Sequence, residues 1–310
     1  MATIPDKLFA CIMHVLLRMV VAPAIVAGVA AAAYGQKNVP EIEKKLILLM
    51  QTADTTQNFD KKCELYDDFT RLLESNLNDT EIEEYLFDSI PNVSAVASKD
   101  KNMIIYSWMI PSREKKAKYG CIIYHKPASS RKYDSKVFVM NDVKDKIKSP
   151  DIALIKYPDW FGCIYYDLVE KQDGDKTVYT LIGFDVNDSI SHRKYIDILS
   201  FDKDNSPIFG LPAFLDDRSG LKSRIIFEYT SQSVMMARYF REFDKIVFNY
   251  LYPIIPEKAD DRSYYVPDVT YDGYEYKYGK WLKVKNIPLR KADDEVQHQS
   301  SQKNVIHNGG

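Results

Sequence analysis

The spacing of hydrophobic residues changes along the chain, and its first part is helical. Between Pro40 and Pro91 hydrophobic residues recur every three or four positions, which predicts amphipathic helices. Two apolar stripes have this spacing: Ile42, Leu46, Leu49, Met50 and Ala53, then Cys63, Tyr66, Phe69, Leu72, Leu73 and Leu77. Asn78 and Glu81 resemble a capping box for a third, short helix through Tyr85, Leu86 and Ile90. We expect the stripes to pack on the rest of the protein.

After Asn92 hydrophobic and polar residues alternate, which predicts β-strands. Asp173-Gly174 lies between two aromatic and β-branched runs and predicts a hairpin turn. The expected strands are Met103–Met109, Gly120–His125, Lys136–Met140, Cys163–Val169, Val178–Val186, Lys194–Phe201, Arg224–Thr230, Val234–Phe240, Lys245–Leu251 and Tyr274–Val284. Short connections favour antiparallel neighbours. We therefore predict an α+β protein in which a short N-terminal helical segment packs on a large antiparallel β-sheet body, folded as a sandwich or an open barrel.

The N-terminus carries a long apolar stretch, Leu8–Ala33, interrupted by His14 and Arg18. A positive residue, the apolar run Met19–Ala33 and small residues before Gln36 are typical of a cleaved signal peptide. A shorter signal beginning at Met13, or an uncleaved anchor, are the alternatives. Cleavage would leave no stable membrane span, and we expect the protein to be exported to the periplasm, the outer surface or the medium.

Four segments follow from these patterns. We predict a signal peptide over residues 1–35, a helical N-terminal subdomain over 36–91, an antiparallel β domain over 92–290 and a disordered tail over 291–310. The tail assignment depends on its low apolar content.

Composition narrows the classes of function. The 310 residues include 42 Lys and Arg against 44 Asp and Glu, for a net charge of -2. This near neutrality argues against nucleic acid as a partner. The chain has 22 Tyr and 14 Phe but only 12 Gly, a bias that suits strands. We interpret the aromatic excess first as a property of a broad sheet.

Three cysteines remain after the predicted cleavage: Cys63, Cys121 and Cys163. A disulfide between Cys121 and Cys163 is one possibility in an oxidising compartment. The favoured interpretation is three small hydrophobic residues without a bridge. The sequence leaves this choice open.

Catalytic motifs are scarce. We find no zinc-binding His or Cys pattern, no Gly-x-Ser-x-Gly and no Gly-x-Gly-x-x-Gly, so we expect no metal and no cofactor. Cys163 and His125 would form a thiol–imidazole pair only if their strands were neighbours.

We assign no catalytic residue, and the candidates for that role are Asp167, Asp185 and Glu228. If Asp185 and Glu228 met across neighbouring strands, about 5 to 9 Å apart, they could hydrolyse a glycoside. In the structural alternative, Glu228 pairs with Arg224 or Arg238.

A tyrosine stripe is the predicted ligand-binding feature. Tyr274, Tyr276 and Tyr278 would lie on one strand face, with Trp281 beyond them. Such rings can stack on a saccharide or contact a protein partner, although closing a sheet is the more ordinary role of strand tyrosines.

Several segments together resemble an uncharacterised family of secreted proteins from Bacteroidetes-type bacteria. They are Asp159–Tyr166, Thr180–Asp185, Pro207–Gly210, Arg224–Tyr229, Pro267-Asp268 and Tyr271–Tyr274, within roughly Ser98 to Leu289. The resemblance implies export and a shared strand scaffold, and it implies no activity. From the sequence we predict an exported, non-enzymatic binding or envelope-associated protein, with a secreted, carboxylate-dependent, glycosidase-like hydrolase as the alternative.

Overall fold

The computed structural model divides into two compact units, residues 1–36 and 37–310. It describes residues 38–77, 85–127, 135–174, 176–216 and 220–289, all within the second unit. The predicted signal peptide and the predicted tail therefore lie outside the described residues. Everything below concerns the second unit.

Two helices open the described chain: α2 (Val39–Thr55) and α3 (Phe59–Leu77). Pro40 lies in the first turn of α2, and the backbone N–H of Lys61 donates to the side chain of Asn58 just before α3. Neither described helix is long and apolar enough to cross a membrane. Two of the predicted helices are thus confirmed.

The third predicted helix is wrong where the structure describes it. Residues 78–84 lie outside the described part, and Tyr85, Leu86 and Ile90 are not helical. Phe87 has a left-handed φ of 45°, which a continuing α-helix does not allow. Phe87 and Ile90 are both buried, so this irregular segment places apolar side chains in the core under the helices.

The strands form three sheets. The first sheet has the order β1-β2-β3-β4-β6, and it contains β1 (Val93–Ala97), β2 (Met103–Ile110), β3 (Lys118–His125), β4 (Lys136–Asp142) and β6 (Asp159–Trp160). A short 3-10 helix, η1 (Lys144–Lys146), follows β4. The strand pairs of the first sheet are antiparallel, except that β4 and β6 run parallel.

The second sheet has the order β5-β10-β9-β8-β7, and β13 also pairs with β9. It contains β5 (Ile155–Lys156), β7 (Ile164–Asp173), β8 (Lys176–Asp185), β9 (Ser191–Phe201), β10 (Pro207–Phe209) and β13 (Arg224–Thr230). Asp173 pairs with Lys176, and Gly174 between them has a φ of 61°. The predicted Asp-Gly hairpin is therefore confirmed.

The third sheet has the order β12-β11-β17-β16-β15-β14. It contains β11 (Phe214–Asp216), β12 (Gly220–Lys222), β14 (Ala237–Phe240), β15 (Lys245–Pro253), β16 (Tyr265–Lys277) and β17 (Lys280–Val284). Two 3-10 turns, η2 (Pro256–Lys258) and η3 (Arg262–Tyr264), lie between β15 and β16.

One predicted strand, Tyr274–Val284, is in fact a hairpin. Tyr278 and Gly279 both have positive φ, 54° and 73°, and the chain reverses there so that Tyr276 pairs with Trp281. The alternation of tyrosine with charged residues continues through the turn, which hides it in the sequence pattern.

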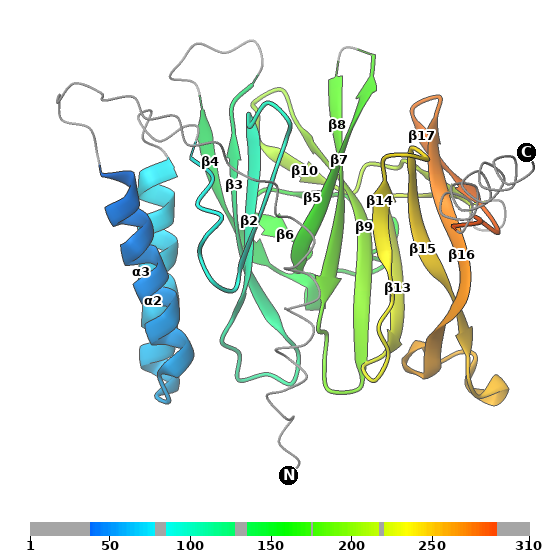
Figure 1. Cartoon of the computed structure of the whole chain (residues 1–310), viewed down its shortest axis with the longest axis horizontal. Coiled ribbons are helices and arrows are strands. Elements are labelled where there is room, and N and C mark those ends of the chain that lie inside the picture. The colour runs from blue at the N-terminus through cyan, green and yellow to red at the C-terminus, as the bar shows by residue number, and fades with distance from the viewer. Residues whose placement is uncertain (1–37, 78–84, 128–134, 175, 217–219, 290–310) are drawn as a thin grey trace, which may run out of the picture. The chain divides into compact units, whose positions relative to one another are not determined.

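The sheets lie in layers, with the helices outside the first (Figure 1). Along β2, Ile104, Tyr106 and Trp108 face the helices, whereas Met103 and Ile105 face the second sheet. A further core joins the second sheet to the third. The three tryptophans divide among these cores: Trp108 under the helices, Trp160 between the first two sheets and Trp281 between the last two. The α+β prediction is confirmed, and of its two forms the open, layered sheets match the sandwich.

Candidate functional site

The predicted carboxylate pair does not meet on neighbouring strands. Asp185 of β8 pairs with Arg193 of β9, and Arg193 pairs in turn with Glu228 of β13. Arg193 therefore lies between the two residues in the pairing, and their strands are two strand spacings apart, roughly 10 Å. The Arg193 guanidinium donates to Glu228 at 2.9 Å. Glu228 has an arginine partner, as the structural alternative expected, but it is neither Arg224 nor Arg238.

Asp185 is buried in a polar network between the first two sheets. Its oxygens accept hydrogen bonds from the Lys144 ammonium at 2.7 Å, from the hydroxyls of Tyr119 and Tyr195 at 2.9 and 2.6 Å, and from the backbone N–H of Asn187 at 2.8 Å. The Lys144 and Asp185 side chains are almost completely shielded from solvent. The Asp185 carboxylate therefore has a structural role, because its hydrogen bonds connect residues of several strands.

Asp167 also has structural partners. It accepts backbone N–H groups of Leu168 at 2.9 Å and Tyr239 at 3.0 Å, and so ties β7 to β14. Burial raises the pKa of its carboxyl. The three candidate carboxylates therefore hold three different contacts and do not converge on one site.

The predicted tyrosine stripe lies mostly inside the protein. Tyr274 and Trp281 are buried in the core between the second and third sheets. The Trp281 indole N–H donates to Thr180 at 2.9 Å, and Tyr276 packs edge-on against the same indole. Tyr278, at the hairpin turn, is 96% exposed. The stripe closes the third sheet on the second and presents no continuous ring surface.

The cysteines and histidines of the β body are structural as well. Cys121 and Cys163 are buried free thiols, and burial raises the pKa of both. Cys163 lies against Gly183, whereas His125 stacks on Phe201 with ring centroids 3.5 Å apart. Burial lowers the pKa of His125 to about 4, and its Nδ1 has no hydrogen-bond partner among the described residues. No thiol–imidazole pair forms between them.

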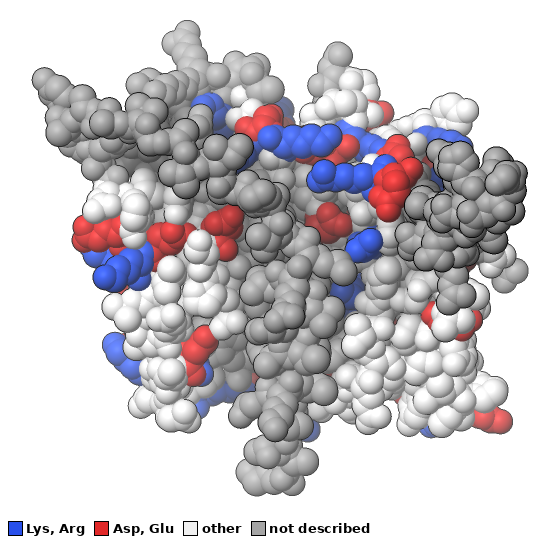
Figure 2. Space-filling model, viewed as in Figure 1, with Lys and Arg blue, Asp and Glu red and all other residues white. Residues whose placement is uncertain are grey.

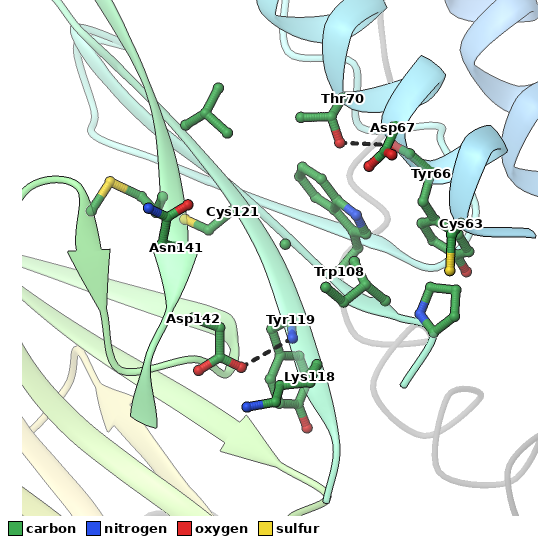
Figure 3. Close-up of a pocket in the computed structure, with 15 residues that line it drawn as sticks. Cys63, Tyr66, Asp67, Thr70, Trp108, Lys118, Tyr119, Cys121, Asn141 and Asp142 are labelled. Carbon is green, nitrogen blue, oxygen red and sulfur yellow. Dashed lines mark hydrogen bonds between the residues drawn. The ribbon is translucent and has the colours of Figure 1, made fainter. Parts of the chain in front are cut away.

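A concave site lies between α3 and the first sheet. It has a volume of ≈ 360 Å³ and lies between one face of α3 and the ends of β2, β3 and β4 (Figure 3). Its lining consists of Cys63, Tyr66, Asp67, Thr70, Trp108, Ile110, Pro111, Lys118, Tyr119, Gly120, Cys121, Val139, Met140, Asn141 and Asp142. The helical residues recur at three- and four-residue spacing, which places them on one side of α3.

Trp108 contributes an unpartnered donor to this cleft. Its indole is 1% exposed and stacks edge-on against Phe69. The indole Nε1 is buried and has no hydrogen-bond partner in the part of the chain that the structure describes. A buried donor without a partner costs about 1–3 kcal/mol, so an acceptor brought by a ligand would offset this cost.

Gly120 explains how the large indole fits. Trp108 and Gly120 are directly opposite each other on β2 and β3. A Cβ at position 120 would lie 2.4 to 2.6 Å from Cε2, Cζ2 and Nε1 of the indole, closer than real Cβ contacts allow. Only glycine lets the ring lie across the β3 backbone, so Gly120 sets the floor of the cleft.

The sheet side of the cleft is held by the buried network described above. Asp142 accepts the backbone N–H groups of Tyr119, Gly162 and Lys144 at 3.1 to 3.2 Å. Burial raises the pKa of Asp142. Because Tyr119 and Lys144 also bind Asp185, the wall of the cleft and the interior ion pair form one connected structure.

The helix side is less tightly held. The Tyr66 hydroxyl is 3.4 Å from Asp54, and burial raises the pKa of Tyr66 to about 12. Cys63 is a free, half-buried thiol. Lys118, at the mouth, binds Asp145 at 2.7 Å. Polar groups therefore surround an apolar floor.

A second cleft is found on the outer side of the helix pair. It is lined by Lys45, Leu48, Leu49, Thr52 and Leu72. This lining is mainly aliphatic and contains no buried unpartnered donor among the described residues, so it offers little to orient a ligand.

Sequence reasoning missed the first cleft. It interpreted Cys63 and Tyr66 as part of an apolar stripe, and it did not consider Trp108, Lys118 or Asn141. One usable signal was Gly120 inside a predicted strand, because a glycine there often marks a place where another group lies close to the strand backbone.

The part of the chain that the structure describes has no group of three or more His, Cys, Asp or Glu side chains placed to hold a metal ion. Comparison with protein-family models, curated proteins and solved structures found no match to this chain. The resemblance to secreted Bacteroidetes-type proteins therefore stays a prediction.

Proposed function

We propose that this protein is an exported, non-enzymatic binding protein and that the cleft between α3 and the first sheet holds a small ligand. The observation that carries the proposal is the buried, unpartnered indole N–H of Trp108 beside a cleft of ≈ 360 Å³. Clefts of this size are within the usual range for small-molecule sites, which combine apolar walls with a few polar groups.

The lining indicates the kind of ligand. The walls formed by Trp108, Ile110 and Val139 suit an apolar body, and the indole N–H requires an acceptor oxygen. Asn141, which is exposed at the mouth, can bind a second polar group. We infer a compact, partly apolar ligand that carries a carbonyl, carboxylate or hydroxyl oxygen.

The binding role is better supported than hydrolysis. The oxygens of Asp185 are occupied by the Lys144 ammonium, two tyrosine hydroxyls and a backbone N–H, and Glu228 is held by Arg193 and Ser191. Export is supported by the N-terminal sequence pattern alone.

The three indole N–H groups provide a direct test. In a ¹⁵N-labelled sample each tryptophan gives a side-chain resonance, and that of Trp108 is assigned by its loss in Trp108→Phe. The other two are internal controls, because Trp160 donates to Tyr165 and Trp281 donates to Thr180.

We expect members of a library of small, oxygen-bearing fragments to shift the Trp108 resonance while the Trp160 and Trp281 resonances stay in place. If no fragment shifts the Trp108 resonance selectively, the cleft is not the ligand site and the proposal is wrong.

A further inference from the structure

A second aromatic surface, unrelated to the predicted stripe, lies on the lower half of the third sheet. Tyr250 and Tyr252 of β15 are 50% and 42% exposed. Leu251, between them, packs into the core shared with the second sheet. Because strand residues alternate between faces, the two tyrosines point away from that core, roughly 7 Å apart along the strand.

A β-bulge on the opposing strand lies beside these tyrosines. The β15–β16 register shifts between Asn249 and Leu251, so that three residues of β16, Asp268–Thr270, lie opposite Tyr250. The Asn249 side chain donates to the Asp268 backbone at 2.8 Å and fixes the bulge. Bulges of this kind redirect side chains at sheet edges.

The surface carries little charge. No charged residue occurs on β15 between Ile246 and Pro256, and the facing bulge contributes one, Asp268, whose carboxylate accepts the Val269 backbone N–H at 2.7 Å and the Thr270 hydroxyl at 3.1 Å. Figure 2 shows that side chains other than Lys, Arg, Asp and Glu cover most of the lower right area, where the lower ends of β13, β15 and β16 lie in Figure 1. An electrostatic partner, such as nucleic acid or a charged polymer, has little to bind here.

We propose that Tyr250 and Tyr252 form a platform that binds a neutral, unbranched oligosaccharide. Each tyrosine offers a flat apolar ring and a polar tip, which match the C–H face and the hydroxyls of a pyranose. Both side chains are exposed, so both hydroxyls are accessible to the sugar. Ile254, exposed two positions further along β15, extends the apolar strip.

The test uses maltoheptaose, cellohexaose and chitohexaose as probes, with binding measured by calorimetry on the full chain. We expect at least one probe to bind, and Tyr250→Ala or Tyr252→Ala to weaken that binding about tenfold. Tyr250→Phe, which keeps the ring, should weaken it less. Tyr278→Ala is the matched control, because Tyr278 is an exposed tyrosine on a separate hairpin turn, and it should bind as the unaltered protein does.

Thermal melts of the variants establish that each is folded, which is expected because both side chains are exposed. Failure of all three probes to bind, or full binding by the Tyr250→Ala/Tyr252→Ala variant, would overturn the proposal. The outcome is independent of the cleft, which is monitored by the Trp108 resonance.

Discussion

The second sheet packs against the first sheet on one face and the third sheet on the other, and the buried charges at these two interfaces differ. Towards the first sheet, Asp185 pairs with Lys144 and Asp197 pairs with Arg224, and all four side chains are buried. Towards the third sheet, Lys194 is buried, and its ammonium donates a hydrogen bond to the Tyr166 hydroxyl at 3.1 Å. The ammonium otherwise lies over the rings of Tyr166 and Phe184.

One strand supplies both arrangements. Lys194 and Asp197 are three residues apart on β9 and so point to opposite faces of the sheet. Burial raises the pKa of Asp197, and the adjacent Arg224 opposes this effect. Burial lowers the pKa of Lys194 to about 7, and no carboxylate among the described residues opposes this shift. At the interface with the first sheet, which we call the paired interface, the buried charges neutralise one another. At the interface with the third sheet, the Lys194 charge destabilises the folded protein.

The largest expected effect comes from removing that charge. Lys194→Met should raise the free energy of unfolding by about 5 kcal/mol at pH 6, because a shift from 10.5 to about 7 disfavours the folded protein at low pH. The unfolded chain binds more protons between pH 7 and 10.5, so the stability of the unaltered protein should rise with pH across that window.

Urea unfolding at several pH values measures both effects. The rise should largely disappear in Lys194→Met and persist in Lys203→Met, where an exposed lysine is changed. An equal pH slope in Lys194→Met and in the unaltered protein would mean that Lys194 has a carboxylate partner in solution.

Removing a charge from the interface between the first and second sheets should lower the free energy of unfolding. Lys144→Met leaves the Asp185 carboxylate buried without its counter-ion and should lower the free energy of unfolding by about 3–5 kcal/mol. The exposed pair Lys116–Asp145 provides the control, and Lys116→Met should cost about 1 kcal/mol or less. Similar losses in the two variants would show that burial does not distinguish the pairs.

A smaller effect is expected at the cleft floor. Gly120→Ala should displace the Trp108 indole and lower the free energy of unfolding by about 1–3 kcal/mol, because a Cβ has no room there. The displacement should also move the Trp108 indole resonance. In a Trp108→Phe background the ring is smaller, so Gly120→Ala should lower the free energy of unfolding by less. An equal loss in both backgrounds would mean that the clash with Trp108 is not its cause.

The smallest effect concerns thiol access and involves no change in stability. Cys121 and Cys163 are buried and their thiol pKa values are raised, so a thiol reagent at pH 8 should leave them unmodified in the native protein. Cys63, half-buried at the cleft, should react slowly. Peptide mass spectrometry distinguishes these sites. Rapid labelling of Cys121 or Cys163 would indicate that the paired interface opens.

Much of the fold was predictable because its signals are local. The three-and-four spacing defined α2 and α3, and Asp173-Gly174 defined the hairpin between β7 and β8. The Tyr278-Gly279 turn was missed because its flanks keep the period of a strand. The irregular geometry at Phe87 was missed because a tertiary core, and not the local sequence, stabilises it.

The candidate site was less predictable because it depends on long-range register. Arg193 separates Asp185 from Glu228 only because β9 pairs with both β8 and β13, which no local pattern specifies. The cleft joins α3 to the ends of β3 and β4, and its unpartnered donor follows from how the Trp108 indole packs on Gly120. Of the tyrosines that the sequence favoured, Tyr274 is buried in the core and Tyr278 lies alone at a hairpin turn, whereas Tyr250 and Tyr252 are exposed on one strand.

The most direct test of the account is the affinity contrast between two ligands of the cleft. The pair consists of the tightest fragment that shifts the Trp108 indole resonance and its analogue with the acceptor oxygen replaced by a methylene group. If the unpartnered N–H of Trp108 drives binding, the oxygen-bearing fragment should bind at least about tenfold more tightly, and this advantage should vanish in Trp108→Phe. Equal affinities of the two fragments for the unaltered protein would contradict the central claim.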